Sequence, residues 1–212
     1  MVSKGKGFLY LSITVIIVAV ATFFIYQYNT YPVNIKSDNL GKKIAQNINT
    51  AKGQKRTEQV IVKVMKVAKL DDSNVAIAFV SVNGEFGRTR LVKGLNGRYK
   101  IMGTRWKSEL KPAQGEIFNT SRGKYQVFMG HNVDFKVKSI KAKAYQYSVK
   151  KQKDIYSDFT SIVSVPSNEY YLVYKKLPED KKLPYYHNDQ ANPISLSIKS
   201  YDENGEVSYS IK

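Results

Sequence analysis

The chain has 212 residues, with 34 lysines and arginines against 17 aspartates and glutamates, and it has no cysteine. Without cysteine it can form no disulfide, thiol nucleophile, thiolate metal site or cysteine-linked lipid anchor. The net charge of +17 favours binding to anionic surfaces and polymers. The length is sufficient for one large or two small hydrophobic cores.

Residues 8–26 contain no charged residue, proline or glycine. At about 1.5 Å per residue, a helix of this length matches the hydrocarbon core of a bilayer. Lys4 and Lys6 precede the segment without an acidic neighbour. The positive-inside rule then predicts a cytoplasmic tail at residues 1–7 and places residues 27–212 outside the cytoplasm. The sequence thus predicts a single-pass protein of the cell membrane.

Cleavage is the alternative to a retained anchor. Ala19-Val20-Ala21 has the small-x-small form of a signal-peptidase site. Such a site normally follows the apolar run, whereas this one lies inside it. The retained anchor is therefore favoured, and cleavage after Ala21 stays open. The part beyond residue 26 has 32 basic and 17 acidic residues, a net charge of +15.

Residues 27–37 are predicted to form a tether, because Tyr31-Pro32 favours extended backbone and ends the preceding helix. Ser37 or Asp38 can cap a second helix. An amphipathic helix of about three turns is predicted there, because three apolar residues spaced by four share one of its faces: Leu40, Ile44 and Ile48.

Four segments rich in β-branched residues follow, separated by turn signals such as Asn83-Gly84. The segment 75–82, VAIAFVSV, is apolar at both parities, which is typical of a strand covered on both faces. One helix followed by four meandering strands predicts an α+β domain over residues 38–107, with the helix on one face of the sheet. This order of elements resembles the cystatin-like or nuclear-transport-factor-like arrangement.

A boundary is predicted around Pro112, and residues 112–212 contain only strand patterns. Seven or so short strands resemble an immunoglobulin-like sandwich, although the Cys–Trp–Cys hallmark is absent. Residues 133–147 are predicted to form one long strand. Its apolar residues change from odd to even numbers midway, which predicts a bulge or a bend between sheets near Lys138-Ser139.

Motifs for catalysis are absent from the sequence. It has no nucleophile elbow, no Walker-type loop and no dinucleotide-binding glycine pattern. His131 and His187 lie beside turn residues with too few partners for a metal site. The sequence therefore predicts no enzyme, no cofactor and no metal.

Lysines cluster around the predicted bend, and four of them are candidates for anion binding: Lys136, Lys138, Lys141 and Lys143. The last two are predicted to point to solvent, followed on the same face by Tyr145 and Tyr147. Such a row could hold an anionic polymer or lipid headgroups. Lysines also protect edge strands against pairing with other chains, and this alternative stays open.

A second candidate is the long, proline-containing loop at residues 177–193. Loops of this length are often functional. Three of its residues are candidates for contact with a partner: Tyr185, Tyr186 and His187.

The first functional hypothesis is a membrane-anchored, non-enzymatic protein of the cell envelope that binds another envelope component, either a protein or an anionic polymer or headgroup. The alternative is a membrane-tethered regulator that inhibits an exported enzyme or sensor by inserting the loop 177–193 into it. Intracellular nucleic acid is not expected as a partner, because the basic part is predicted to lie outside the cytoplasm. Salt should weaken charge-driven binding steeply and loop insertion little.

Overall fold

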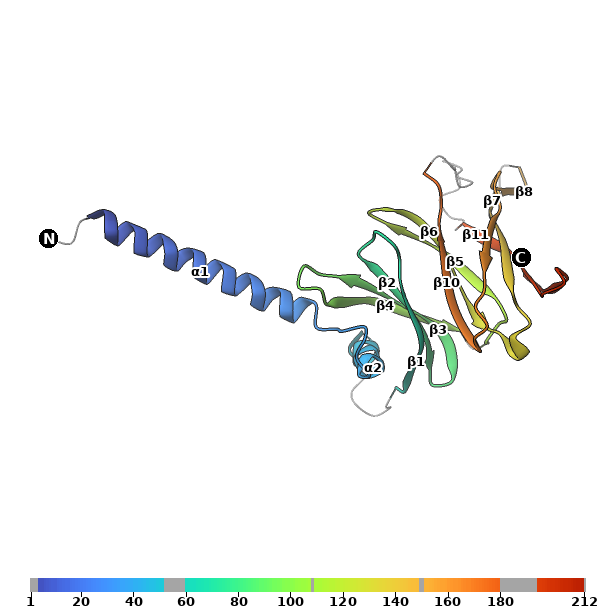
Figure 1. Cartoon of the computed structure of the whole chain (residues 1–212), viewed down its shortest axis with the longest axis horizontal. Helices are drawn as coiled ribbons and strands as arrows, with labels where there is room; N and C mark the ends of the chain where they lie inside the picture. Colours follow the sequence, from blue (N-terminus) through green and yellow to red (C-terminus); the bar gives the residue numbers. More distant parts are fainter. Residues whose placement is uncertain (1–3, 52–59, 108, 149–150, 180–193, 212) are drawn as a thin grey trace.

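The computed structural model describes residues 4–51, 60–107, 109–148, 151–179 and 194–211. An apolar helix, α1 (Lys4–Thr30), precedes a body built from a second helix and antiparallel sheets. Figure 1 shows α1 extending away from this body. From Tyr10 to Thr30 it is long and apolar enough to cross a membrane, and only 6% of that stretch is buried. The exposure argues against a core helix.

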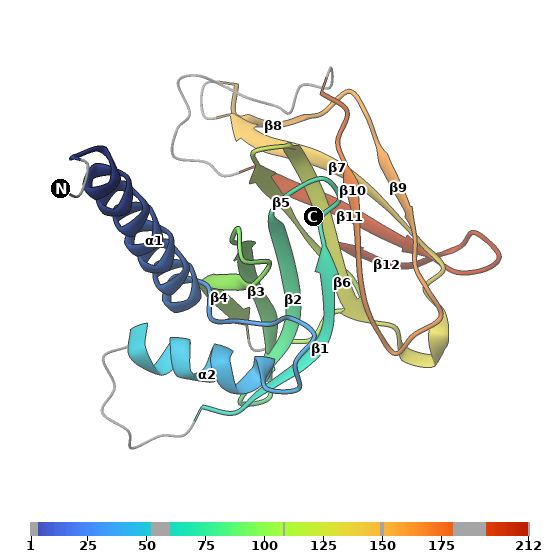
Figure 2. The ribbon, with the colours of Figure 1, turned by 60° about the vertical axis from the view of Figure 1, so that its left-hand side comes forward.

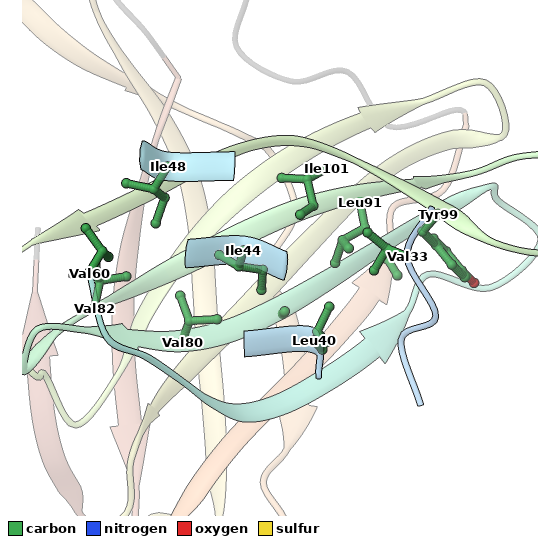
Figure 3. Packing of buried hydrophobic residues seen from close by; sticks show 12 residues of the cluster. Val33, Leu40, Ile44, Ile48, Val60, Val80, Val82, Leu91, Tyr99 and Ile101 are labelled. Atoms are coloured by element: carbon green, nitrogen blue, oxygen red, sulfur yellow. The ribbon is translucent and has the colours of Figure 1, made fainter. Parts of the chain in front are cut away.

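Helix α2 (Leu40–Ala51) covers one face of sheet A. This sheet consists of four antiparallel strands in chain order: β1 (Val62–Lys69), β2 (Val75–Val82), β3 (Glu85–Lys93) and β4 (Tyr99–Lys107). The predicted apolar face of the helix is confirmed, because Leu40, Ile44 and Ile48 are all buried against the sheet (Figure 3).

Two further sheets lie beyond sheet A (Figures 1 and 2). Sheet B has the order β10 (Tyr170–Lys176), β6 (Gly123–His131), β5 (Gln114–Thr120). Sheet C has the order β12 (Val207–Ile211), β11 (Ser195–Tyr201), β7 (Ser139–Ser148), β8 (Lys153–Tyr156), and β9 (Ser161–Ser164) also pairs with β7. The two sheets enclose a common apolar cluster that includes Phe128, Ile140 and Ile198.

Sheet B also packs against sheet A. Phe79 on β2 lies in one buried cluster with Tyr125 and Met129 on β6. The prediction that β2 is covered on both faces is confirmed, because Ala78 and Val80 face α2 while Ile77 and Phe79 face sheet B. The body is therefore built of four layers, in the order α2, sheet A, sheet B and sheet C.

Polar contacts reinforce the interface between sheets A and B. Arg88 on β3 donates two hydrogen bonds to the carboxylate of Glu116 on β5, and its guanidinium lies 4.6 Å from the ring centroid of Phe118. The segment between β4 and β5 is also bonded to sheet B, since the hydroxyl of Tyr171 on β10 donates to the carbonyl of Pro112 over 2.5 Å. The two-domain division near Pro112 stays a prediction. A C-terminal unit separated from sheet A would expose the residues that it contributes to the apolar cluster between sheets A and B.

The predicted strand over residues 133–138 is wrong. Val133–Phe135 form a 3-10 turn, in which Asp134 and Phe135 both have φ of 55°. The buried Asn132 closes this turn: its amide donates to the carbonyl of Val137, and its Oδ1 accepts from the N–H of Val137. The change of apolar phase in the sequence marks this crossing from sheet B to sheet C.

Replacing Phe79 with alanine should destabilise the whole body, because its ring is buried between sheets A and B. We expect a loss of about 3–5 kcal/mol in the free energy of unfolding. Denaturant unfolding of the detergent-solubilised chain measures it. A single cooperative transition should shift as a unit, while Met102→Ala, at a 57% exposed side chain, should change stability by about 0.5 kcal/mol at most. Two transitions, of which only one moves, would establish independent domains.

Alkaline pH should weaken the same interface. Burial and a 2.5 Å hydrogen bond to Asp71 raise the pKa of Tyr174 from 10.0 to about 12. The unfolded chain ionises this hydroxyl near pH 10, so its contribution is complete below pH 10 and is lost as pH rises toward about 12. Denaturant unfolding across this range should therefore show a falling stability, and Tyr174→Phe should reduce the fall. An equal fall in both proteins would contradict this role.

Candidate anion-binding face

The structure separates the four predicted lysines into two groups. Lys141 and Lys143 lie on the outward side of β7, while Ile140, Ala142 and Ala144 on the same strand are buried. Their predicted orientation is thus confirmed. Lys136 and Lys138 do not continue this row, because both precede the strand.

Both of these earlier lysines have local roles. The Lys136 Nζ lies 3.4 Å from a carboxylate oxygen of Asp134 in the 3-10 turn. The backbone of Lys138 joins two strands of sheet C, since its N–H donates to the carbonyl of Tyr201 and its carbonyl accepts from the N–H of Val165. Only Lys141 and Lys143 therefore share the outward face of β7, and an anion-binding role for Lys136 and Lys138 stays a prediction.

Strand β11 brings a further lysine to this face. Lys199 stands directly opposite Lys141 in the antiparallel register, and Ser197 stands opposite Lys143. Aromatic rings flank the amines: the Lys141 Nζ lies 4.5 Å from the ring centroid of Tyr201, and the Lys143 Nζ lies 5.9 Å from that of Tyr156. We call this set the lysine–tyrosine face: Lys141, Lys143, Tyr145, Tyr156, Lys199 and Tyr201.

The electrostatics of this face favour an anionic ligand. Like charges directly opposite each other on neighbouring strands are destabilising. Within the described part of the chain, no carboxylate forms an ion pair with Lys141, Lys143 or Lys199. The amines of Lys141 and Lys143 are instead placed over tyrosine rings, whose faces attract positive charge weakly. A bound polyanion would relieve the repulsion between the opposed amines.

Protection of a sheet edge does not explain these lysines. Strand β7 pairs with β11 on one side and with β8 and β9 on the other. Among the described strands, β7 is paired on both sides from Ser139 to Ala142 and again at Tyr145, so the lysines do not lie on an edge strand. The lysines lie on the open face of a central strand, where no such protection is needed.

Sequence reasoning missed Lys199, Tyr201 and Tyr156. All three lie on strands that follow β7 in the chain, and only the pairing of sheet C brings them to it. The outward orientation of Lys199 could have been predicted from the sequence, because Leu196 and Ile198 alternate with Ser197 and Lys199. The alternation does not indicate that β11 pairs with β7.

The other predicted candidates are not brought to this face. Tyr185, Tyr186 and His187 lie outside the described residues. His131 stacks on Tyr170 at 4.9 Å between ring centroids, with Nε2 3.5 Å from a carboxylate oxygen of Glu169. The described ranges contain no group of three or more metal-binding side chains. The non-enzymatic character stays a prediction.

No family model, curated protein or solved structure matches this chain. The candidate site therefore depends on the geometry of the lysine–tyrosine face alone.

Replacing Lys199 with glutamate should stabilise the fold while removing a cation from the proposed binding face. The change converts a repulsive cross-strand pair with Lys141 into an attractive one, for which we expect a gain of about 0.2–1 kcal/mol in the free energy of unfolding. Denaturant unfolding at low salt measures the gain, which should shrink as salt is added. Lys199→Gln is the control, because it removes repulsion without adding attraction. A loss of stability in Lys199→Glu would mean that the two amines do not repel each other.

Proposed function

We propose that this protein is a membrane-anchored, non-enzymatic binding protein of the cell envelope that holds an anionic polymer on the lysine–tyrosine face. The observation that carries the proposal is the opposed pair of Lys141 and Lys199, with Lys143 beside it and tyrosines at both ends. Three amines on one open sheet face can follow a chain of regularly spaced anions. The tyrosine rings limit side-chain motion and contribute hydrogen-bonding hydroxyls.

The position of the face favours a polymer over the headgroups of the anchoring membrane. Sheet C lies at the end of the body away from α1 (Figure 1). The body is also held to the end of this helix, since the Asn96 amide donates to the carbonyl of Gln27, and Val33 pairs with Tyr99. A face held on the side away from the bilayer is suited to a ligand that lies beyond it.

The proposed anchor is α1, with the N-terminus in the cytoplasm and the body outside it. Its support is the length and exposure of the apolar helix, together with the two lysines before residue 8. We also infer that the body combines a cystatin-like helix-on-sheet unit with an immunoglobulin-like sandwich. The support for this is α2 on the four-stranded meander, and sheets B and C facing each other. Both architectures present open faces for binding.

The double substitution Lys141→Glu and Lys143→Glu should abolish most retention on immobilised long-chain polyphosphate at low salt. Each substitution replaces an attraction with a repulsion. The slope of log affinity against log salt should become shallower by roughly 1.5, because each phosphate that a lysine neutralises accounts for about 0.7–0.9 of it. The melting temperature should stay within the range of ordinary surface changes. Polyglutamate of similar length tests whether phosphate is required or any polyanion suffices.

The matched control is Lys63→Glu with Lys66→Glu, which makes the same change in net charge at exposed positions of β1. This variant should keep most of the retention. If both double variants lose binding equally, the polymer responds to net charge alone, and the lysine–tyrosine face has no special role. Unchanged retention in the Lys141 and Lys143 variant would also refute the proposal.

A further inference from the structure

A second candidate site lies at the opposite end of the body, where α1 meets sheet A. A cleft of about 470 Å³ opens between the C-terminal turns of α1 and the turn between β3 and β4. We call it the membrane-proximal cleft, and it is lined by Phe24, Ile25, Tyr28, Asn29, Asn96 and Arg98. We propose that this cleft binds the headgroup of an anionic phospholipid, an inference that depends on the membrane anchor proposed above.

The position of the cleft along α1 matches the level of the lipid headgroups if α1 spans the membrane. Its helical lining begins at Phe24 and Ile25, inside the apolar stretch, and ends at Asn29, beyond it. Tyrosines 26, 28 and 31 cluster at the same level, as aromatic side chains do at the boundary between hydrocarbon and water. A ligand in this cleft would therefore meet apolar side chains on the membrane side and polar ones on the other.

The β3–β4 turn supplies the charge. Arg98 donates from Nη2 to the carbonyl of Pro32 over 2.7 Å, and its guanidinium lies 4.7 Å from the ring centroid of Tyr28. These contacts fix the guanidinium at the helix end. Among the described residues its Nε has no hydrogen-bond partner, so the protein contacts do not satisfy all donors of the guanidinium. In the described part of the chain, Arg98 forms no ion pair with a carboxylate.

The turn is built to lie against the helix end. Gly94 is needed at close approach, because a Cβ there would lie 2.5 Å from the ring of Tyr31. The Asn96 side chain links the two elements, since Oδ1 accepts from the N–H of Arg98 and Nδ2 donates to the carbonyl of Gln27. The cleft is therefore held between two elements that cannot separate without breaking these contacts.

The flanks of the turn fit the same ligand. Leu95 at its tip is 83% exposed, which leaves an apolar side chain available for contact with lipid. Lys93 and Lys100 are exposed on the adjoining strands, and no acidic residue occurs between residues 86 and 108. Basic residues beside a bilayer attract anionic lipid. Together, an apolar wall, a fixed guanidinium, amide groups and an exposed leucine match a phosphate joined to acyl chains.

The test uses the full chain in detergent and phosphatidylglycerol as the probe. Native mass spectrometry should show one phosphatidylglycerol retained per chain, in preference to phosphatidylcholine. Asn29→Asp places a negative charge in the cleft at an exposed position and should weaken this retention at least tenfold. Arg98→Gln should weaken it further. Glycerol 3-phosphate, which has the phosphate without acyl chains, should displace the lipid poorly.

Lys100→Gln is the matched control, because it removes one positive charge from the same hairpin but lies outside the cleft. It should leave retention of the single lipid almost unchanged. Equal losses in Lys100→Gln and Arg98→Gln, or unchanged retention in Asn29→Asp, would overturn the proposal. Thermal unfolding of each variant identifies any that fail to fold, and Asn29→Asp keeps the test decisive if Arg98→Gln does so.

Failure of the anchor gives a different result. Flotation of the full chain with phosphatidylcholine vesicles reports anchoring alone. A chain that does not float lacks the proposed anchor, and the lipid site falls with it. A chain that floats, but retains phosphatidylglycerol and phosphatidylcholine equally in detergent, keeps its anchor and has no headgroup site.

Discussion

Strand β6 is buried on both faces from Tyr125 to Gly130, and the rest of the body is arranged around this constraint. Sheet A covers one of its faces and sheet C covers the other. A sheet with two apolar faces cannot face water on either side, so sheet B needs both neighbours. The sandwich and the helix-covered sheet are consequently layers of one stack. The central strand of their common member, sheet B, therefore has no open face for a ligand between Tyr125 and Gly130.

The two proposed ligand sites lie at the two ends of the stack. At the far end, sheet C has a covered inner face and an open outer face, which carries Lys141 and Lys199. At the near end, α2 covers sheet A, and the β3–β4 turn reaches the end of α1. Each end presents cations without carboxylate partners among the described residues, Lys141 and Lys199 at one and Arg98 at the other. Two anionic ligands at opposite ends would connect the bilayer with a polymer beyond it.

The two proposed sites can serve opposite ends of the body only if the body is held in place relative to α1. A flexible tether after α1 would let the body rotate freely. Instead, α1 continues to Thr30, and the chain is bonded to sheet A within three residues, at Val33. The contact between Arg98 and Tyr28 adds a further link across the junction. The body is thereby held in a preferred orientation relative to α1, which directs the lysine–tyrosine face away from the helix.

Several elements could be predicted from the sequence, because their signals are local. The uncharged run from 8 to 26 indicated the apolar helix, the spacing of Leu40, Ile44 and Ile48 indicated the amphipathic one, and the double parity of β2 indicated a strand with two buried faces. These patterns are readable because each depends on the period of one element. The outward orientation of Lys141 and Lys143 was readable for the same reason.

Which elements contact one another could not be predicted from such local patterns. Lys199 faces Lys141 because β11 pairs with β7 across more than fifty residues of sequence, and no local period encodes a strand's partner. The turn at Val133–Phe135 formed because Asn132 bonds the backbone of Val137, which overrides the strand pattern of alternating apolar residues. The membrane-proximal cleft likewise needs Arg98 beside Tyr28, two residues whose proximity comes from the fold. Contacts distant in sequence depend on how complementary faces pack, and packing is a property of the whole stack.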